Sequence, residues 1–199
     1  MAAAKLFADV GFEAASMSLV AERAGTSIGN LYKYFANKDE LFAAVLPESF
    51  AKALREKTRR RVKAVGNVQD IRRLPVTAPY HVLADDLLDY CLGHRERVVI
   101  LLGRAEGTPY ATFAEDFVER LTTWAFEYIK RAWPNIVPSP ALRFAVRRIY
   151  RSFVASMADT LANVRGETHV REAIFYLTAH HQGGLLHLLE SAAARTRTS

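Results

Sequence analysis

Hydrophobic positions recur at helical spacing along almost the whole chain. Between residues 111 and 133 an apolar stripe runs at steps of four and three, through Phe113, Phe117, Leu121, Trp124 and Tyr128. Sustained alternation with a period of two, the mark of a half-buried strand, is lacking. The pattern therefore predicts an all-α protein.

Glycine, proline and asparagine mark the ends of the predicted helices. These helices cover Ala2–Val10, Met17–Ala24, Ile28–Phe35, Asp39–Val65, Tyr80–His94, Arg95–Arg104, Ala111–Trp133, Pro140–Asn163 and Thr168–Ala193. Pro47 has no amide hydrogen to donate, so we expect the helix over residues 39–65 to kink or break there. Ser139 followed by Pro140 is typical of a helix N-terminus.

The last predicted helix is apolar on two faces. One face carries Val170, Ile174, Leu177, Leu185 and Leu188, and the other carries Phe175, Leu186 and Leu189. A helix that is apolar on two sides must be covered on two sides. We expect one cover to be the protein's own core and the other a second copy of the chain. The expected interface residues of this homodimer are Gly183, Gly184, Leu185 and Leu188, the glycines allowing a close helix crossing although each costs about 1 kcal/mol relative to alanine.

Composition narrows the class of protein. The chain has 199 residues, half of them hydrophobic, which suits one compact unit or a small domain joined to a larger one. The longest apolar run, residues 98–102, is too short to span a membrane, and the N-terminus lacks the apolar stretch of a secretory signal. The single cysteine, Cys91, excludes an internal disulfide. We therefore expect a cytoplasmic protein.

The net charge of +6 is unevenly distributed. Residues 52–63 hold seven basic residues and one acid, whereas residues 1–46 hold four basic and five acidic residues, a balance of −1. The excess of positive charge hints at an acidic partner. The basic run is better explained as the solvated face of a helix.

The sequence G-x-S-x-G between Gly25 and Gly29 has two interpretations. In a serine hydrolase it would be a nucleophile elbow, which needs a strand that ends at Ser27 and a parallel sheet around it. The preceding segment carries Glu22 and Arg23 at helical spacing, and the chain offers no strands for such a sheet. Ser27 is better explained as the N-cap of a helix that follows a turn at Gly25. Two helices joined by a short glycine turn, over residues 16–35, form the helix-turn-helix layout.

The stretch LFADVGFEAASMSLVAERAGTSIGNLYKYFANKDELFAAVL, residues 6–46, resembles the DNA-binding region of TetR-type (TetR/AcrR) transcriptional regulators. The matching features include Gly11-Phe12, Ala24-Gly25, Ser27 with Gly29, and Leu31-Tyr32 with Phe35. The resemblance is specific over residues 4–46 and rests on length and helical pattern beyond them. It implies a helix-turn-helix DNA-binding domain over residues 1–46 and a ligand-binding and dimerisation domain over residues 47–199.

The resemblance also implies individual roles at the DNA. The residues concerned are Ser27, Ile28, Gly29, Asn30, Tyr32, Lys33, Tyr34 and Lys38. Ile28 and Asn30 are placed to meet base edges, Tyr32, Lys33 and Lys38 to bind phosphates, and Gly29 to let the helix approach the backbone. The alternative for Tyr32 and Tyr34 is partial core packing.

Family members usually begin with a basic arm and a longer first helix, whereas here Ala2–Val10 alone precede Gly11. With a balance of −1 over residues 1–46, we expect either additional residues upstream of Met1 or weak DNA binding.

A small-molecule effector is the second partner that the resemblance implies. Aromatic and polar residues of the middle helices are the candidates for its pocket: Tyr90, Cys91, Phe113, Phe117, Trp124, Tyr128, Phe153 and Met157. Each of them is also explained by plain core packing. His180, His181, His187 and Glu190 lack the spacing of a tight metal-ligand set. We expect no metal, no cofactor and no catalytic residue.

Three classes of function follow. The first is a DNA-binding transcriptional regulator, a repressor released from its operator by a small molecule. The second is a helical DNA-binding architectural or division factor without an inducer. The third is a serine hydrolase that uses Ser27, which would require strand content.

Overall fold

The computed structural model describes residues 2–197, with side chains for residues 2–195, and it is helical throughout with no strand in that range. The all-α prediction is therefore confirmed. In chain order the helices are α1 (Ala2–Ala14), α2 (Met17–Arg23), α3 (Ile28–Tyr32), α4 (Lys38–Val45), α5 (Glu48–Lys63), the 3₁₀ turn η1 (Ile71–Arg73), α6 (Pro79–Gly93), α7 (Arg95–Gly103), α8 (Phe113–Ala132), α9 (Pro140–Asn163) and α10 (Glu167–Arg197).

The break expected at Pro47 is observed, because extended backbone at this residue separates α4 from α5. The first and third helices end at other residues than predicted. The first helix continues to Ala14 across a kink at Gly11, whose φ of +82° a glycine adopts without a Cβ clash. The third ends at Tyr32 instead of Phe35, and hydrogen-bonded turns carry the chain from Lys33 onward.

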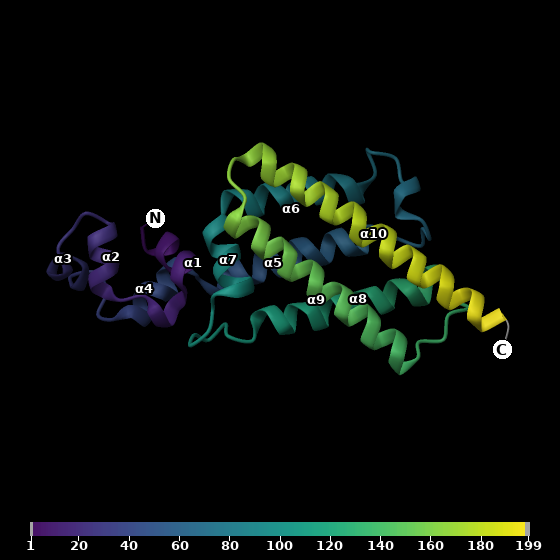
Figure 1. Cartoon of the computed structure of the whole chain (residues 1–199), viewed down its shortest axis with the longest axis horizontal. Coiled ribbons are helices and arrows are strands. Elements are labelled where there is room, and N and C mark those ends of the chain that lie inside the picture. Colours follow the sequence, from purple (N-terminus) through teal and green to yellow (C-terminus); the bar gives the residue numbers. More distant parts are fainter. Residues whose placement is uncertain (1, 198–199) are drawn as a thin grey trace.

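The molecule is elongated, with α1 to α4 at one end and the last turns of α10 at the other (Figure 1). Helices α5 to α10 form the larger part, in which α9 packs against α7, α8 and α10. Helix α7 also packs against α1. It therefore joins the N-terminal helices to the larger part of the molecule.

Buried apolar side chains form one continuous core through both parts. Around α1 the core centres on Leu6 and Phe7, which are fully buried, and on Phe42, whose ring meets that of Phe7 edge to face at 5.3 Å. The Phe42 ring also lies 6.5 Å from the ring of Tyr110, which packs against the core of the larger part. Because the two parts share one close-packed core, a movement of helices in one part displaces atoms of the other part.

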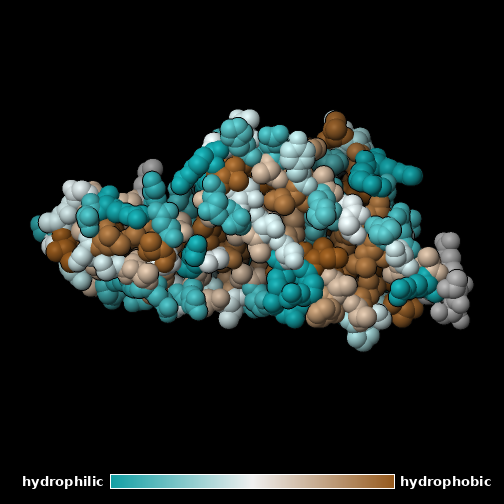
Figure 2. All heavy atoms as spheres, viewed as in Figure 1, coloured by the Kyte–Doolittle hydropathy of each residue, from teal (hydrophilic) through white to brown (hydrophobic). Residues whose placement is uncertain are grey.

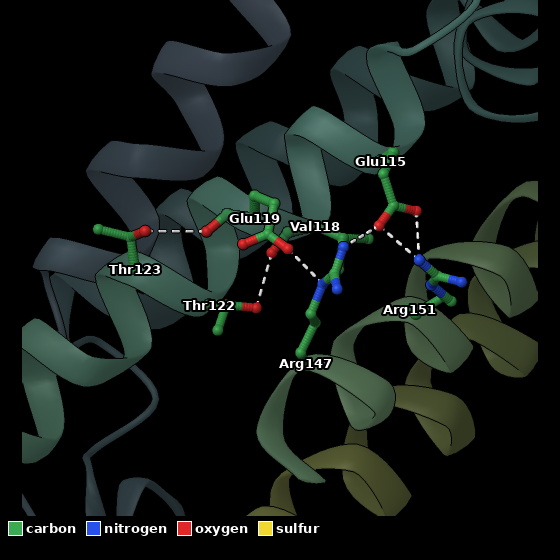
Figure 3. A network of polar contacts seen from close by, with 7 residues as sticks. All are labelled: Glu115, Val118, Glu119, Thr122, Thr123, Arg147 and Arg151. Carbon is green, nitrogen blue, oxygen red and sulfur yellow. Dashed lines mark hydrogen bonds and ion pairs between the residues drawn. The ribbon is translucent and has the colours of Figure 1, made fainter. Parts of the chain in front are cut away.

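Charged side chains fix the pairing of α8 with α9 (Figure 3). Glu115 pairs with Arg147 and Arg151, and Glu119 pairs with Arg147. One of these bonds, from Arg151 Nη2 to Glu115 Oε2, measures 2.5 Å. The four side chains are about half exposed, so each pair contributes about 0–1 kcal/mol to stability. Their shared geometry serves mainly to set the register of the two helices.

Candidate DNA-binding surface and interior cavity

Side-chain caps define both helices of the helix-turn-helix. Ser16 precedes α2, and its hydroxyl accepts a hydrogen bond from the amide of Leu19 at 3.1 Å. Ser27 precedes α3 in the same way and accepts from the amide of Asn30 at 3.1 Å. Each cap satisfies an amide that the first turn of a helix leaves without a partner. Ser27 thus has the geometry of a cap, and no strand leads up to it.

The turn between α2 and α3 depends on Gly25. Its φ of +65° lies in the left-handed region that side chains disfavour, and the following amide, that of Thr26, closes the turn on the carbonyl of Ala21 at 3.0 Å. Beneath the turn, Val20, Ala21 and Leu31 are buried against one another and α1. Helix α3 is therefore held by one buried leucine and two ordered ends, with the rest of its surface outward.

Large apolar and aromatic side chains of α3 and of the turn that follows it are exposed. Ile28 is 42%, Tyr32 50% and Tyr34 72% exposed, although tyrosine and isoleucine are residues that a fold usually covers. Tyr32 and Tyr34 therefore contribute little to the core. A cluster of exposed aromatic and apolar groups on a short, well-fixed helix is a contact surface.

Polar groups complete this surface. Asn30 is exposed, and its side-chain amide nitrogen donates to the Thr26 hydroxyl at 3.0 Å, which orients the side chain. Lys33 is exposed and forms no ion pair with any other described residue. A Cβ placed at Gly29 would meet no atom within 4 Å, so the backbone of α3 is open to an approaching molecule at that position.

Lys38 is engaged inside the protein. Its ammonium group donates to the carbonyls of Phe12 at 2.8 Å and Ala15 at 3.0 Å, and it lies 4.2 Å from the centre of the Phe12 ring. These carbonyls lie at the end of α1, where a cation is favourable. A phosphate contact by Lys38 would compete with these bonds, so its first role is to join α4 to α1. Sequence spacing gives no sign of this contact.

A short glycine turn between two capped helices, with the exposed side of the second helix outward, defines the class of helix-turn-helix DNA-binding proteins. Residues 1–45 match the family model described as "Bacterial regulatory proteins, tetR family". The N-terminal region is therefore similar to the TetR family of bacterial regulatory proteins, which confirms the resemblance seen in its sequence.

Two relatives show how far the similarity reaches. The chain is 27% identical over 142 residues to an uncharacterized HTH-type transcriptional regulator, YhgD, of Bacillus subtilis, an alignment that covers 71% of this chain and 69% of the relative. It is 48% identical over 46 residues to the HTH-type transcriptional activator FasR of Mycolicibacterium smegmatis, which covers 23% of this chain and 21% of that protein. The first similarity extends over most of the chain, whereas the second covers about a quarter of it.

An interior cavity of about 70 Å³ lies among α5, α6, α8, α9 and α10, with the η1 segment at its rim. Its apolar wall includes Val62, Val65, Ala125, Leu185, Leu186 and Leu189, and its polar wall includes Gln69, Asp70, Tyr80, Tyr128, Tyr150, His181 and Gln182. Tyr128 is the pocket candidate that lines it, and its hydroxyl donates to the carbonyl of Val68 at 2.8 Å.

The other pocket candidates lie in the surrounding core. Phe113 and Phe117 stack on each other at 5.8 Å, and Tyr90 stacks on Phe50 at 5.5 Å. Trp124 and Met157 are partly buried against the core, and Phe153 stacks behind His181. Cys91 is buried, and burial raises the pKa of its thiol to about 12, which keeps the sulfur protonated and unreactive.

Three cavity residues carry chemistry that sequence patterns did not single out: Tyr80, Tyr150 and Gln182. A fourth such residue, Arg61, lies behind the wall and contacts Tyr80. Arg61 belongs to the basic run of α5, but its guanidinium turns inward and lies 4.9 Å from the centre of the Tyr80 ring. The basic run therefore has an inward side as well as a solvated one. Burial, with Arg61 and His180 nearby, lowers the pKa of His181 to about 4, so the imidazole is neutral at physiological pH.

The residues expected at a dimer interface are divided between two environments. Leu185 is buried within the protomer, where it lines the cavity, and Leu188 is partly buried. Gly183 is half-buried and Gly184 is exposed, with no atom within 4 Å of a Cβ at either position. Of the second predicted face, Leu186 and Leu189 are also buried, whereas Phe175 is 67% exposed.

No helix in the described part of the chain combines the length and hydropathy needed to cross a membrane. Over the same residues, His, Cys, Asp and Glu side chains form no group of three that could hold a metal ion.

Proposed function

We propose that this protein is a cytoplasmic transcriptional repressor that binds a double-stranded DNA operator as a homodimer and leaves it when a small molecule fills the interior cavity. Residues 1–46 would form the DNA-binding domain and residues 47–199 the ligand-binding and dimerisation domain. The observation that carries the proposal is the exposed side of α3, held on a capped helix-turn-helix. The relative FasR is named as an activator, but the same DNA contacts serve repression and activation.

The proposed contacts follow from the exposed side of α3. Ile28 and Asn30 would lie against base edges in the major groove, with Ile28 able to meet a thymine methyl group. Tyr32, Lys33 and Tyr34 would lie along the phosphates, and Ser27 and Gly29 would allow the backbone to come close. Lys38 would support this surface from behind by fixing α4 to α1.

Helices α5 and α4 connect the cavity wall to the helix-turn-helix through close packing. Helix α5 contributes Val62 to the cavity wall at one end, and Val65 follows just after that end. At the other end, α5 follows α4 after only Leu46 and Pro47. Leu46 is 1% exposed, so α4 cannot slip freely when α5 moves. A ligand that favours one position of α5 would therefore shift the placement of α3, which is how differential binding to two states regulates a protein.

Exposed stripes on the last two helices support a homodimer. On α9 the stripe runs through Phe144, Arg148, Ser152 and Ala155, and on α10 through Tyr176, His180, Gly184 and His187. Apolar residues show between hydrophilic ones over this side of the molecule (Figure 2). The small residues in both stripes allow two helices to approach closely, so α9 and α10 would form a four-helix bundle with their partners.

The test begins with duplexes of random sequence, because the operator must be found before binding can be measured. Purified protein should enrich a pseudo-palindromic sequence, since a two-fold symmetric dimer presents two copies of α3. Lys130→Ala, on the exposed surface of α8, serves as a matched control that should leave binding unchanged. Failure to enrich any duplex would refute the proposal. An operator that no small molecule from cell extract releases would favour the architectural or division factor.

A further inference from the structure

The hydroxyl of Tyr80 is an unusually strong hydrogen-bond donor on the cavity wall. Its oxygen accepts two bonds, from Arg61 Nη2 at 3.1 Å and from Gln182 Nε2 at 2.9 Å. One of those donors is a cation, and a hydroxyl that accepts such bonds donates its own proton more strongly. Tyr80 is only 6% exposed and lines the cavity, and its O–H proton has no acceptor among the described residues.

Two further groups on the same wall lack protein partners. The hydroxyl of Tyr150 and the imidazole of His181 line the cavity, and neither forms a hydrogen bond with another described residue. The His181 ring is fixed between Phe153, 4.2 Å away between ring centres, and Tyr150 at 5.0 Å. Buried polar groups are normally hydrogen-bonded, so three rigid groups without acceptors indicate a site for an acceptor-rich molecule.

The charge near this wall is positive. The Arg61 guanidinium forms no ion pair with any described residue, and its Nε is buried without a hydrogen-bond partner. Asp70, the carboxylate at the rim, is already paired with Arg72 at 2.8 Å and Arg73 at 3.4 Å. Arg61 is partly buried, and a cation in that position without an ion-pair partner is less well solvated than in water. A negative charge in the cavity would offset this cost.

Size and the apolar wall define the rest of the ligand. Seven aliphatic residues line the cavity together with the donors: Val62, Val65, Ile71, Ala125, Leu185, Leu186 and Leu189. A water needs about 10–15 Å³ of such space, so the volume of about 70 Å³ holds about five to seven non-hydrogen atoms. An occupant of this size has room for one small polar head and a short apolar tail.

We infer that the cavity binds a short-chain monocarboxylate. Its carboxylate accepts hydrogen bonds from the hydroxyls of Tyr80 and Tyr150 in the field of Arg61, and its alkyl chain lies against the leucines of α10. This inference rests on the proposed function, because it names the chemical class of the effector. Butyrate has the size that the cavity requires.

The test compares butyrate with butyramide, which has the same number of non-hydrogen atoms and no charge. Binding to the full-length protein is measured without DNA, by calorimetry and by the shift of the melting temperature. Butyrate should bind at least about tenfold more tightly than butyramide, because a charge-assisted bond is stronger than a neutral one. Equal affinities, or no melting shift by millimolar butyrate, would overturn the inference.

Variants locate the carboxylate. Tyr150→Phe removes a hydroxyl that no described residue uses, so the fold is retained, and butyrate should bind about five- to tenfold more weakly. Arg61→Gln should bring the ratio of butyrate to butyramide affinity close to one. Tyr176→Phe, an exposed tyrosine on α10, is the matched control and should change neither. Unchanged butyrate binding in Tyr150→Phe would overturn the assigned position of the head group.

DNA measurements separate this inference from the function on which it rests. Operator binding is followed by fluorescence anisotropy with and without butyrate. If butyrate binds at Tyr150 but the operator stays bound, the carboxylate site is supported, and the proposal that this effector releases the operator is contradicted. If the operator binds and butyrate does not, the carboxylate site is overturned while the DNA-binding function stands.

Discussion

Single residues of the helix-turn-helix take their roles from the backbone groups around them. Ser27 stands in a motif shared with hydrolases, yet its hydroxyl is engaged by the amide of Asn30, as in any helix N-cap. Lys33 and Lys38 are five residues apart and chemically alike. One is exposed beside α3, whereas the other is bound to the carbonyls at the end of α1. Residue type alone does not separate a DNA contact from a structural bond.

Asn30 and Tyr32 should affect DNA binding in different ways. Asn30→Ala should cost about 1–3 kcal/mol of binding free energy and relax the preference at one base position, because it removes a base contact. Tyr32→Phe should weaken binding to all sequences by a similar factor, since phosphate contacts position the protein without specifying sequence. Anisotropy on operator and random duplexes measures both. Equal losses on the two duplexes for Asn30→Ala would remove it from base recognition.

The two lysines provide a paired prediction. Lys38→Ala should lower the free energy of unfolding by about 1–2 kcal/mol, because hydrogen bonds from a charged group to the end of α1 are lost. Lys33→Ala should leave stability within about 0.5 kcal/mol of the wild type, as expected for a surface substitution, and should weaken DNA binding. Urea unfolding distinguishes the two variants. A stable Lys38→Ala protein with weak DNA binding would restore Lys38 as a phosphate contact.

His181 should make stability depend on pH. Burial depresses its pKa from an ordinary value of 6.5 to about 4, so between these values the unfolded chain binds more protons than the folded one. The contribution of His181 to the free energy of unfolding is therefore fully present above pH 6.5. It is lost as the pH falls towards 4, by up to about 3 kcal/mol. His181→Phe should reduce that slope. Urea unfolding between pH 7.5 and pH 4.5 gives the comparison.

At the scale of elements, local signals placed most helix ends. Ser16, Ser27, Asn37 and Ser139 each accept a hydrogen bond from a first-turn amide of the helix that follows. Pro47 divides the fourth predicted helix because it has no amide hydrogen. Helix α10 is less simple, since its glycines lie inside the helix and one of them is exposed.

Gly184 gives a prediction for α10. A side chain there meets no atom of the same protomer within 4 Å, so in an isolated protomer alanine would stabilise the helix by about 1 kcal/mol. In the proposed dimer the same position lies at a close helix crossing, and Gly184→Glu should yield monomers. Sedimentation at micromolar concentration measures the state. Gly93→Glu, at an exposed position with similar space, is the control and should remain dimeric.

At the scale of the whole molecule, most of the positive charge lies away from the proposed DNA-binding surface. The positive run of α5 lies in the larger part, where Lys57 pairs with Asp86 and Arg61 turns towards the cavity. Near α3, Arg23 is paired with Asp9 and Lys38 is engaged internally, which leaves Lys33 as the exposed lysine next to that helix. In the proposed complex with DNA, few cations next to α3 would therefore be available to the phosphates.

A shallow dependence on salt follows from this distribution. Each phosphate neutralised changes the slope of log affinity against log salt by about −0.9 on duplex DNA. Lys33→Ala in both protomers should therefore reduce the magnitude of the slope by about 1.8. Salt titrations of the two proteins on one operator provide the measurement. An unchanged slope would show that Lys33 does not meet a phosphate, and Lys130→Ala is again the control.

The sequence by itself determined the helices and the helix-turn-helix of residues 16–35. Periodicity, caps and turn glycines act over a few residues, so they can be read without knowing what packs where. The family resemblance over residues 4–46 is confirmed for the same reason, because it rests on that local pattern.

Only the tertiary structure determined the position of the cavity, the hydrogen bonds of Lys38 to α1 and the inward direction of the Arg61 side chain. Tyr80, Tyr150 and Gln182 come from three helices, and Tyr80 and Gln182 are 102 positions apart in the chain. Hydrophobic periodicity shows which face of a helix is buried but not which partner covers it. It therefore gave Phe113, Phe117 and Tyr128 as equal candidates for the pocket. Of these three, only Tyr128 lines the cavity. The partner of a side chain is fixed by how helices pack, and that depends on contacts between distant parts of the chain.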